Sequence, residues 1–156
     1  SYRSAAVAFA CGGGSGVTRL QLPPNGTLDA VHIPKGVSYL WLAASSNRRV
    51  DFALLETESR ECIAAEGAGV TGNRNHSGVY RGTGVVLAAG PGPRAAGARA
   101  APSQANLYVL GALPTAATLR LTNRNASWAA MVTLNLSYVG HEGCPELPDG
   151  CATFSR

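Results

Sequence analysis

The 156-residue chain has no long hydrophobic run, and its basic residues are not clustered. No apolar stretch approaches the roughly 20 residues that a membrane-spanning helix needs, so we expect no membrane span. The net charge of +4 comes from scattered residues, twelve Arg and one Lys, of which only Arg48 and Arg49 are adjacent. Nucleic-acid binding needs a clustered basic face with interleaved aromatics, so we expect no nucleic-acid partner.

Residues for catalysis or metal binding are also sparse. The three histidines share no spacing typical of metal ligands: His32, His76 and His141. The three aspartates lie far apart in the sequence: Asp29, Asp51 and Asp149. Glu56, Glu58 and Glu61 do cluster, and we interpret them as a solvated charged turn. The sequence therefore predicts no enzyme, no metal site and no cofactor.

N-glycosylation sequons, in contrast, are more frequent than chance predicts. Eight Asn and 22 Ser plus Thr in 156 residues would give about one sequon, and the chain has four. They begin at Asn25, Asn75, Asn125 and Asn135. N-glycosylation needs the secretory lumen and a side chain on the surface. The sequons therefore predict a secreted or cell-surface glycoprotein with covalent N-glycans at these four positions.

The four cysteines are an even number, as expected for an extracellular protein with two disulfides. Four cysteines allow three pairings. We favour Cys144 with Cys151, because the residues between them read as a tight polar loop. That choice leaves Cys11 to pair with Cys62. Four free thiols are the alternative, and the sequons make it the weaker one.

Alternating apolar and polar residues predict strands, whereas helix signals are poor. The clearest case is 128–139, where every second residue from Val132 to Tyr138 is apolar and the residues between, Asn135 among them, are polar. We expect strands at 4–10, 17–22, 28–33, 37–43, 49–56, 61–64, 79–88, 105–110, 118–122 and 128–139. Strand 37–43 is apolar on both faces towards its end, so it should be central or covered. This spacing predicts a single all-β domain, a β-sandwich or jelly-roll-like barrel of about 8–10 strands.

Two further features concern the surface. Residues 90–104 are of low complexity, lack large apolar side chains and predict a long surface loop. A carbohydrate-binding site would need an aromatic platform, for which the candidates are Tyr39, Trp41, Tyr80, Tyr108 and Trp128. Burial in the core is the preferred interpretation of each, and Tyr80, which follows a sequon, is the best candidate for an exposed aromatic.

The N-terminal segment has two interpretations. Ala5, Val7 and Phe9 alternate with smaller or polar residues and precede the glycines at 12–14. The segment is either the first strand of its own sheet or a strand donated to a neighbouring subunit, with the glycines as a hinge. Head-to-tail exchange that does not close into a ring builds a filament.

Several strand-like pieces between Leu28 and Val139 resemble a β domain of extracellular proteins of algae, other protists and some bacteria. The matching pieces are Val31-His-Ile-Pro-Lys-Gly, Arg49-Val-Asp-Phe-Ala-Leu-Leu, Asn106-Leu-Tyr-Val-Leu-Gly, Leu119-Arg-Leu and Val132-Thr-Leu-Asn-Leu-Ser-Tyr. The chain is also loosely similar to the sandwich domains appended to secreted peptidases. The resemblance implies a surface or matrix module that builds coats, appendages or fibrils, and it implies no catalytic residue.

The sequence thus predicts an N-terminal strand and hinge at 1–12, a sandwich domain at 13–143 and a disulfide-closed loop at 144–156. Because there is no initiator Met and no signal peptide, we expect Ser1 to follow a cleavage or a cut within a longer protein. The expected function is a structural subunit of an extracellular glycosylated assembly, with copies of itself or other surface glycoproteins as partners. The alternative is a carbohydrate-binding or adhesive module of a larger cell-surface protein.

Overall fold

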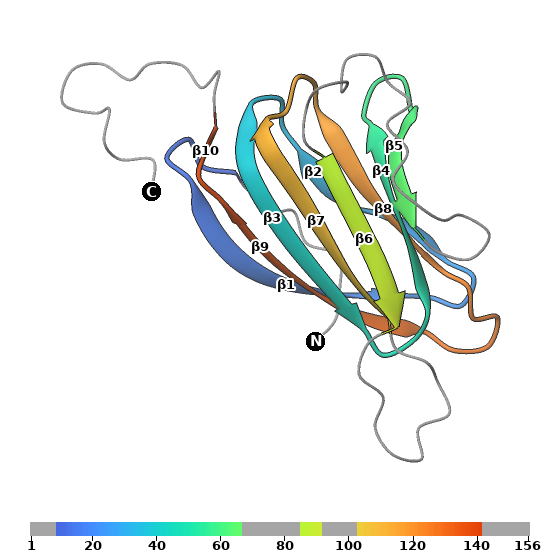
Figure 1. Ribbon diagram of the computed structural model, residues 1–156. Helices are drawn as coiled ribbons and strands as arrows, with labels where there is room; N and C mark the ends of the chain where they lie inside the picture. Colours follow the sequence, from blue (N-terminus) through green and yellow to red (C-terminus); the bar gives the residue numbers. More distant parts are fainter. Residues whose placement is uncertain (1–8, 67–84, 92–102, 142–156) are drawn as a thin grey trace, which may run out of the picture.

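The computed structural model describes residues 9–66, 85–91 and 103–141, and within these ranges the chain forms ten β-strands and no helix (Figure 1). The strands are β1 (Gly14–Leu22), β2 (Thr27–Ile33), β3 (Val37–Ser46), β4 (Val50–Glu56), β5 (Cys62–Glu66), β6 (Val85–Pro91), β7 (Ser103–Ala112), β8 (Ala117–Asn123), β9 (Ala130–Tyr138) and β10 (Gly140–His141). The predicted all-β sandwich is confirmed.

The strands form two antiparallel sheets that pack face to face. The larger sheet has the order β1-β9-β3-β7-β6, with the short β10 also paired to β3, and the smaller sheet has the order β2-β8-β4-β5. Figure 1 shows the larger sheet in front of the smaller one. Strand β3 lies between β9 and β7, which confirms the prediction that 37–43 is central.

Two tight turns link one sheet to the other. Between β1 and β2, Gly26 N–H donates to the Pro23 carbonyl (2.8 Å), and Asn25 at the third turn position has φ of 53°. A type II turn needs φ above zero at that position, where Asn is tolerated, and favours proline before it, which here is Pro24. Between β2 and β3, Gly36 takes the corresponding place with φ of 89°. Proline and glycine spacing therefore fixes where the chain crosses between the sheets.

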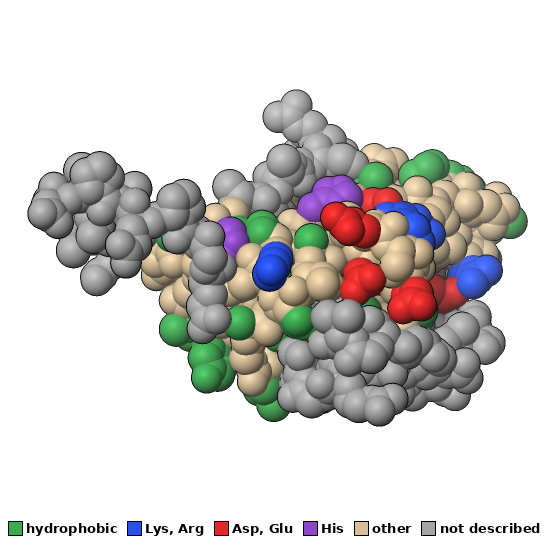
Figure 2. All heavy atoms as spheres, turned by 90° about the horizontal axis from the view of Figure 1, so that it is seen from above, with side chains coloured by type: hydrophobic (Ala, Val, Ile, Leu, Met, Phe, Trp, Pro, Cys, Tyr) green, Lys and Arg blue, Asp and Glu red, His purple; other side chains and the backbone are tan. Residues whose placement is uncertain are grey.

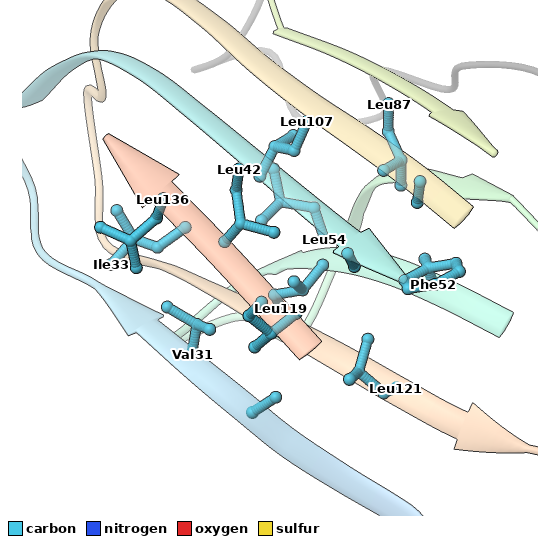
Figure 3. Packing of buried hydrophobic residues seen from close by; sticks show 14 of the residues in the cluster. Val31, Ile33, Leu42, Phe52, Leu54, Leu87, Leu107, Leu119, Leu121 and Leu136 are labelled. Atoms are coloured by element: carbon cyan, nitrogen blue, oxygen red, sulfur yellow. The ribbon is translucent and has the colours of Figure 1, made fainter. Parts of the chain in front are cut away.

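The core lies between the two sheets and is mostly apolar, with Asn123 among the few polar side chains that are buried. Figure 3 shows side chains from both layers meeting there, for example Leu42 and Leu107 of the larger sheet and Phe52, Leu54 and Leu119 of the smaller one. Each of these five is at most 2 % exposed. Burying a side chain of this size stabilises the fold by about 1.5–3 kcal/mol relative to leaving it exposed.

The predicted facing of the clearest strand, 128–139, is confirmed. In β9 the apolar residues from Val132 to Tyr138 are buried, and Asn135 between them is exposed. In β8, Leu119 and Leu121 point inward and Arg120 is half-buried on the outer side.

Some predicted boundaries are wrong. The expected loop 90–104 is shorter at both ends, because Gly90 and Pro91 pair in register with Gln104 and Ser103 to extend β6 and β7. Small residues there still form ladder hydrogen bonds, which depend on the backbone and not on side-chain size. Of the expected strand 4–10, only Phe9 and Ala10 lie within the described residues, and neither is in a strand.

The predicted pairing of Cys11 with Cys62 is also wrong. Cys11 is disulfide-bonded, and Cys62 is not its partner. The carbonyl oxygen of Cys11 accepts a hydrogen bond from His141 N–H (3.1 Å) beside β10, whereas Cys62 begins the edge strand β5 of the other sheet. The predicted Cys144–Cys151 bond lies outside the described residues.

The glycines proposed as a hinge form a tight junction within the domain. Gly13 is buried and has φ of 90°, and Gly14 is already the first residue of β1. A Cβ added at Gly13 would lie 2.4 Å from the carbonyl oxygen of Val139.

Nowhere in the described ranges is there a helix long and apolar enough to cross a membrane.

Candidate functional site

The outer face of the larger sheet carries a group of exposed aromatic and apolar side chains. Tyr39 and Trp41 lie on β3, and Tyr108 and Leu110 lie on β7. Their exposed fractions are 60 %, 39 %, 41 % and 65 %, respectively. We call these four residues the aromatic platform.

Strand register brings the platform together. Trp41 and Tyr108 are directly opposite each other in the β3–β7 ladder, where facing side chains are in contact range. Tyr39 lies two residues before Trp41 on β3 and Leu110 two residues after Tyr108 on β7, and both side chains are exposed like those of the pair. On β3 the intervening residue Leu40 is buried, which fixes its neighbours on the outer side.

A hydrogen bond holds the indole of Trp41 along the sheet. Its Nε1–H donates to Oδ1 of Asn106, 3.2 Å away on β7. Asn106 faces Ala43, the next outward residue of β3, so the indole leans along the sheet surface towards the small Ala43 side chain. A ring fixed in this way presents apolar surface to solvent without losing further side-chain entropy when a ligand binds.

The β3–β7 ladder is irregular beside the platform. Its register shifts between Ser38 and Leu40, and Tyr39 there has φ of 50°. A bulky side chain in the left-handed region is a true outlier, costing on the order of 1–3 kcal/mol. Such strain concentrates at functional sites, and here it accompanies the aromatic side chain with the largest exposed fraction on the platform.

The face around the platform has almost no charge. Most outward residues of β1, β9, β3 and β7 are Ser, Thr, Asn, Gln, small or apolar residues, with Arg19 of β1 as the charged exception in the described part of this face. The chemistry offered by the platform is therefore stacking and neutral hydrogen bonding.

Charged side chains gather elsewhere. Figure 2 looks at one end of the sandwich and shows acidic, basic and His side chains near one another over the middle of that end.

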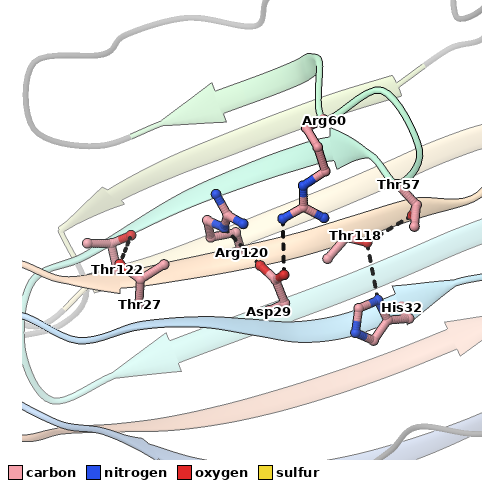
Figure 4. A network of polar contacts seen from close by, with 8 residues as sticks. All are labelled: Thr27, Asp29, His32, Thr57, Arg60, Thr118, Arg120 and Thr122. Carbon is pink, nitrogen blue, oxygen red and sulfur yellow. Dashed lines mark hydrogen bonds and ion pairs between the residues drawn. The ribbon is translucent and has the colours of Figure 1, made fainter.

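The outer face of the smaller sheet is different, because its polar side chains bind one another. Figure 4 shows Asp29 of β2 accepting hydrogen bonds from Arg120 (2.8 Å) and Arg60 (3.1 Å). Thr118 Oγ1 lies 3.2 Å from His32 Nδ1 and 2.8 Å from Thr57 Oγ1. Paired in this way, these side chains stabilise the sheet and offer little to a ligand.

The pKa of Asp29 is lowered from its ordinary value. The hydrogen bond from Arg120 is the main cause, and Arg60 adds to it, while partial burial acts in the opposite direction. Asp51, on the same sheet, forms an ion pair with Arg124. The two described aspartates are thus held as ion-pair partners and not as a facing acid pair.

Three of the four sequons lie within the described residues. Asn25 and Asn125 are neighbours at the turns that precede β2 and β9, joined by a hydrogen bond from Asn25 N–H to the Asn125 carbonyl (2.9 Å). Asn135 lies on the outer face of the larger sheet, opposite Ala43. Asn75 lies outside the described residues.

The proposed assembly residues are only partly described. The Phe9 ring packs against Tyr138 of its own domain, with ring centroids 5.0 Å apart, and Ala10 N–H donates to the Tyr138 hydroxyl. Phe9 therefore packs against the core of its own domain. Ala5 and Val7 lie outside the described residues.

The described histidines and acidic residues form no common site. His32 is on β2, His141 Nε2 is 2.9 Å from the Lys35 carbonyl oxygen, and His76 is outside the described residues. Glu56 accepts a hydrogen bond from Thr115 (3.0 Å). Within the described part of the chain, no three His, Cys, Asp or Glu residues are placed to hold a metal ion.

The expectation that the candidate aromatics are buried is wrong for Tyr39, Trp41, Tyr108 and Trp128, all of which are exposed. Trp128 lies away from the platform, next to the guanidinium of Arg48 at 5.3 Å. Asn106 and Leu110 were not singled out by the sequence. One signal was available: the alternation Leu40, Leu42, Ala44 places Tyr39 and Trp41 on the opposite, outer face. Tyr80 lies outside the described residues.

Comparison of the chain with protein-family models, with curated proteins and with solved structures gives no match. The resemblance to extracellular β domains therefore stays a hypothesis from sequence pattern.

Proposed function

We propose that this chain is an extracellular, N-glycosylated β-sandwich module that binds neutral carbohydrate on its aromatic platform. The observation that carries the proposal is the pair Trp41 and Tyr108, directly opposite on adjacent strands and both exposed. The sequons support the extracellular location.

The chemistry of the platform fits a sugar ring. The face of a pyranose with axial C–H groups is apolar and weakly positive, and it stacks on the negative π face of an indole or phenol. The ring hydroxyls then need hydrogen-bond partners at its edge, which Asn106 and Tyr108 can supply as both donors and acceptors.

The uncharged surroundings favour neutral sugars over acidic ones. An acidic polysaccharide would be recognised by an Arg or Lys beside the stacking residue. Arg19, on the edge strand β1, is the charged residue of the described part of this face and is separated from β3 by β9. We therefore expect hexose or N-acetylhexosamine polymers to bind in preference to uronic acids.

Isothermal titration calorimetry of the secreted, glycosylated protein with neutral oligosaccharides tests the proposal. Trp41→Ala should weaken binding about 5–30-fold, the usual cost of removing an aromatic anchor, which is about 1–2 kcal/mol. Tyr108→Ala should act in the same direction.

Trp128→Ala is the matched control, since it removes the other tryptophan, which is exposed too and lies off the platform. It should leave affinity unchanged. Equal losses in Trp41→Ala and Trp128→Ala, or no oligosaccharide binding by the parent protein and by its Asn135→Gln variant, would contradict the proposal.

A second candidate function is the structural subunit, and the edge strand β1 favours it. In the described part of the chain, the nine residues of β1 pair only with β9, so the other edge of β1 has backbone groups that a neighbour's strand could pair with. Val17 on this strand is exposed.

The oligomeric state of the native protein separates the two functions. A filament subunit should form extended particles in electron microscopy and lose them on deletion of residues 1–8, which stops before the packed Phe9 side chain. A protein that stays monomeric at high concentration with and without these residues is not such a subunit.

A further inference from the structure

Asn135 lies beside the aromatic platform. On the β9–β3 ladder Asn135 is opposite Ala43 and Ser137 is opposite Trp41. Asn135 and Trp41 are therefore diagonal neighbours on the same outer face, with Cβ atoms about 7–8 Å apart or less. A sequon at this place attaches its sugar to the face that carries the platform.

No large side chain separates Asn135 from Asn106 along their row. Ala43, directly opposite Asn135, has only a methyl side chain, and Asn106 follows in the same row on β7. Asn135 itself is exposed. A sugar joined to its Nδ2 therefore has a shallow, uncharged place to lie, with Trp41 on one side and the amide of Asn106 at the far end.

The orientation of the indole suits this arrangement. The hydrogen bond to Asn106 leans the Trp41 ring towards the row of Ala43, which is the row that also contains Asn135. The same contacts that would receive a free sugar, a π face and an amide edge, are thus offered to a sugar attached next to them.

We propose that the N-glycan of Asn135 lies against Trp41 and occupies the aromatic platform in cis, so that it competes with any external carbohydrate. The proposal rests on the proposed function for the chemistry of the platform, and it adds a regulator of that site, the chain's own glycan. A ligand on a short flexible tether has an effective concentration in the millimolar range. If the platform binds a free sugar with a millimolar dissociation constant, the attached glycan fills about half of the sites and halves the apparent affinity.

Quenching of Trp41 fluorescence by acrylamide tests the contact directly. Trp128→Phe leaves Trp41 as the single tryptophan of the secreted protein. Adding Asn135→Gln should then raise the quenching constant of Trp41 about twofold, because the glycan no longer covers the indole. Enzymatic removal of the glycans from the folded Trp128→Phe protein should give the same rise, and this second measurement does not depend on how well the variant folds.

Ser127→Ala is the matched control. It removes the sequon of Asn125 while leaving Asn135 and the platform intact, so the quenching of Trp41 should not change. Intact-mass analysis must show that the Asn135→Gln protein and the Ser127→Ala protein have each lost one glycan. If Asn135 carries a glycan and its removal leaves Trp41 quenching unchanged, or if Asn135 carries none, the proposal is wrong.

The two proposals fail in different ways. If Asn135→Gln uncovers Trp41 but no neutral oligosaccharide binds the uncovered platform, the cis contact stands and the proposed carbohydrate-binding function is wrong. If oligosaccharides bind equally well with and without the Asn135 glycan and Trp41 quenching is the same, the cis contact is wrong and the binding function stands.

Discussion

The backbone N–H of Asn25 donates a 2.9 Å hydrogen bond to the carbonyl oxygen of Asn125, so two sequons far apart in the sequence are adjacent in the fold. One buried side chain holds both turns. Asn123 Nδ2 lies within hydrogen-bond distance of the carbonyl oxygens of Pro23 (3.1 Å) and Trp128 (2.8 Å), and its Oδ1 accepts from Asn125 N–H (2.9 Å).

Asn123→Ala should destabilise the protein by about 2–4 kcal/mol, because it leaves buried backbone groups in two turns without their partner. Asn123 is 0 % exposed, so water cannot easily replace the amide. Urea unfolding at neutral pH measures the loss. Asn47→Ala is a suitable control, since exposed Asn47 accepts one hydrogen bond, from Met131 N–H, and its removal should cost less than about 1 kcal/mol.

Gly13→Ala should destabilise the protein by about 1–3 kcal/mol. The added Cβ would meet the Val139 carbonyl oxygen at 2.4 Å, and the φ of 90° disfavours any side chain. Gly16→Ala on the same segment meets nothing within 4 Å and should change the free energy of unfolding by less than about 0.5 kcal/mol. Thermal unfolding of the two variants compares them. Equal midpoints would mean that the Gly13 junction yields easily, as the hinge hypothesis requires.

Asp29 should give the protein a small stability term that disappears in acid. Its pKa is lowered by Arg120 and Arg60, so the ion pairs contribute fully above the pKa of the unfolded chain, about 4, and are lost as the pH falls through the lower folded value. Because the groups are about one-third exposed, the term should stay below about 1 kcal/mol. Unfolding measured from pH 7 to pH 2 should show Asp29→Asn less stable than the parent at neutral pH and equal to it in acid. Exposed Glu58, changed to Gln, serves as the control.

At least three of the four sequon asparagines should carry glycan. Asn125 Oδ1 accepts hydrogen bonds from the backbone of Ser127 and Trp128 (2.8 Å each), which holds the amide in a defined turn at the surface. Intact mass before and after enzymatic deglycosylation gives the number of glycans. A mass shift for one glycan or none would overturn the extracellular assignment together with the two proposals that depend on it.

Local periodicity predicts most of the described strands and the facing of the clearest one. The alternation through Asn135 placed that residue outward, and the apolar run of 37–43 identified the central strand. These inferences succeed because side-chain direction in a strand repeats every two residues, whatever the strand pairs with.

The site could not be predicted in the same way, because it depends on which strands become neighbours. Trp41 and Tyr108 meet only through the β3–β7 register, and Asn106 reaches the indole through the same ladder. The pairing of Cys11 with Cys62 fails for a related reason: it follows by elimination from the loop between Cys144 and Cys151, and local spacing does not show which distant segments become neighbours. Aromatic side chains in a small β domain favour burial, whereas the alternation along β3 indicates that Tyr39 and Trp41 face outward.

The near absence of charge on the described outer face of the larger sheet has a consequence for the medium in which the protein works. Screening by salt ranges from a Debye length of about 30 Å at 0.01 M to about 3 Å at 1 M, and it weakens contacts between charges. Stacking on Trp41 and neutral hydrogen bonds at Asn106 involve no such contacts. Attachment through this face would therefore keep the same strength in fresh water and in brine.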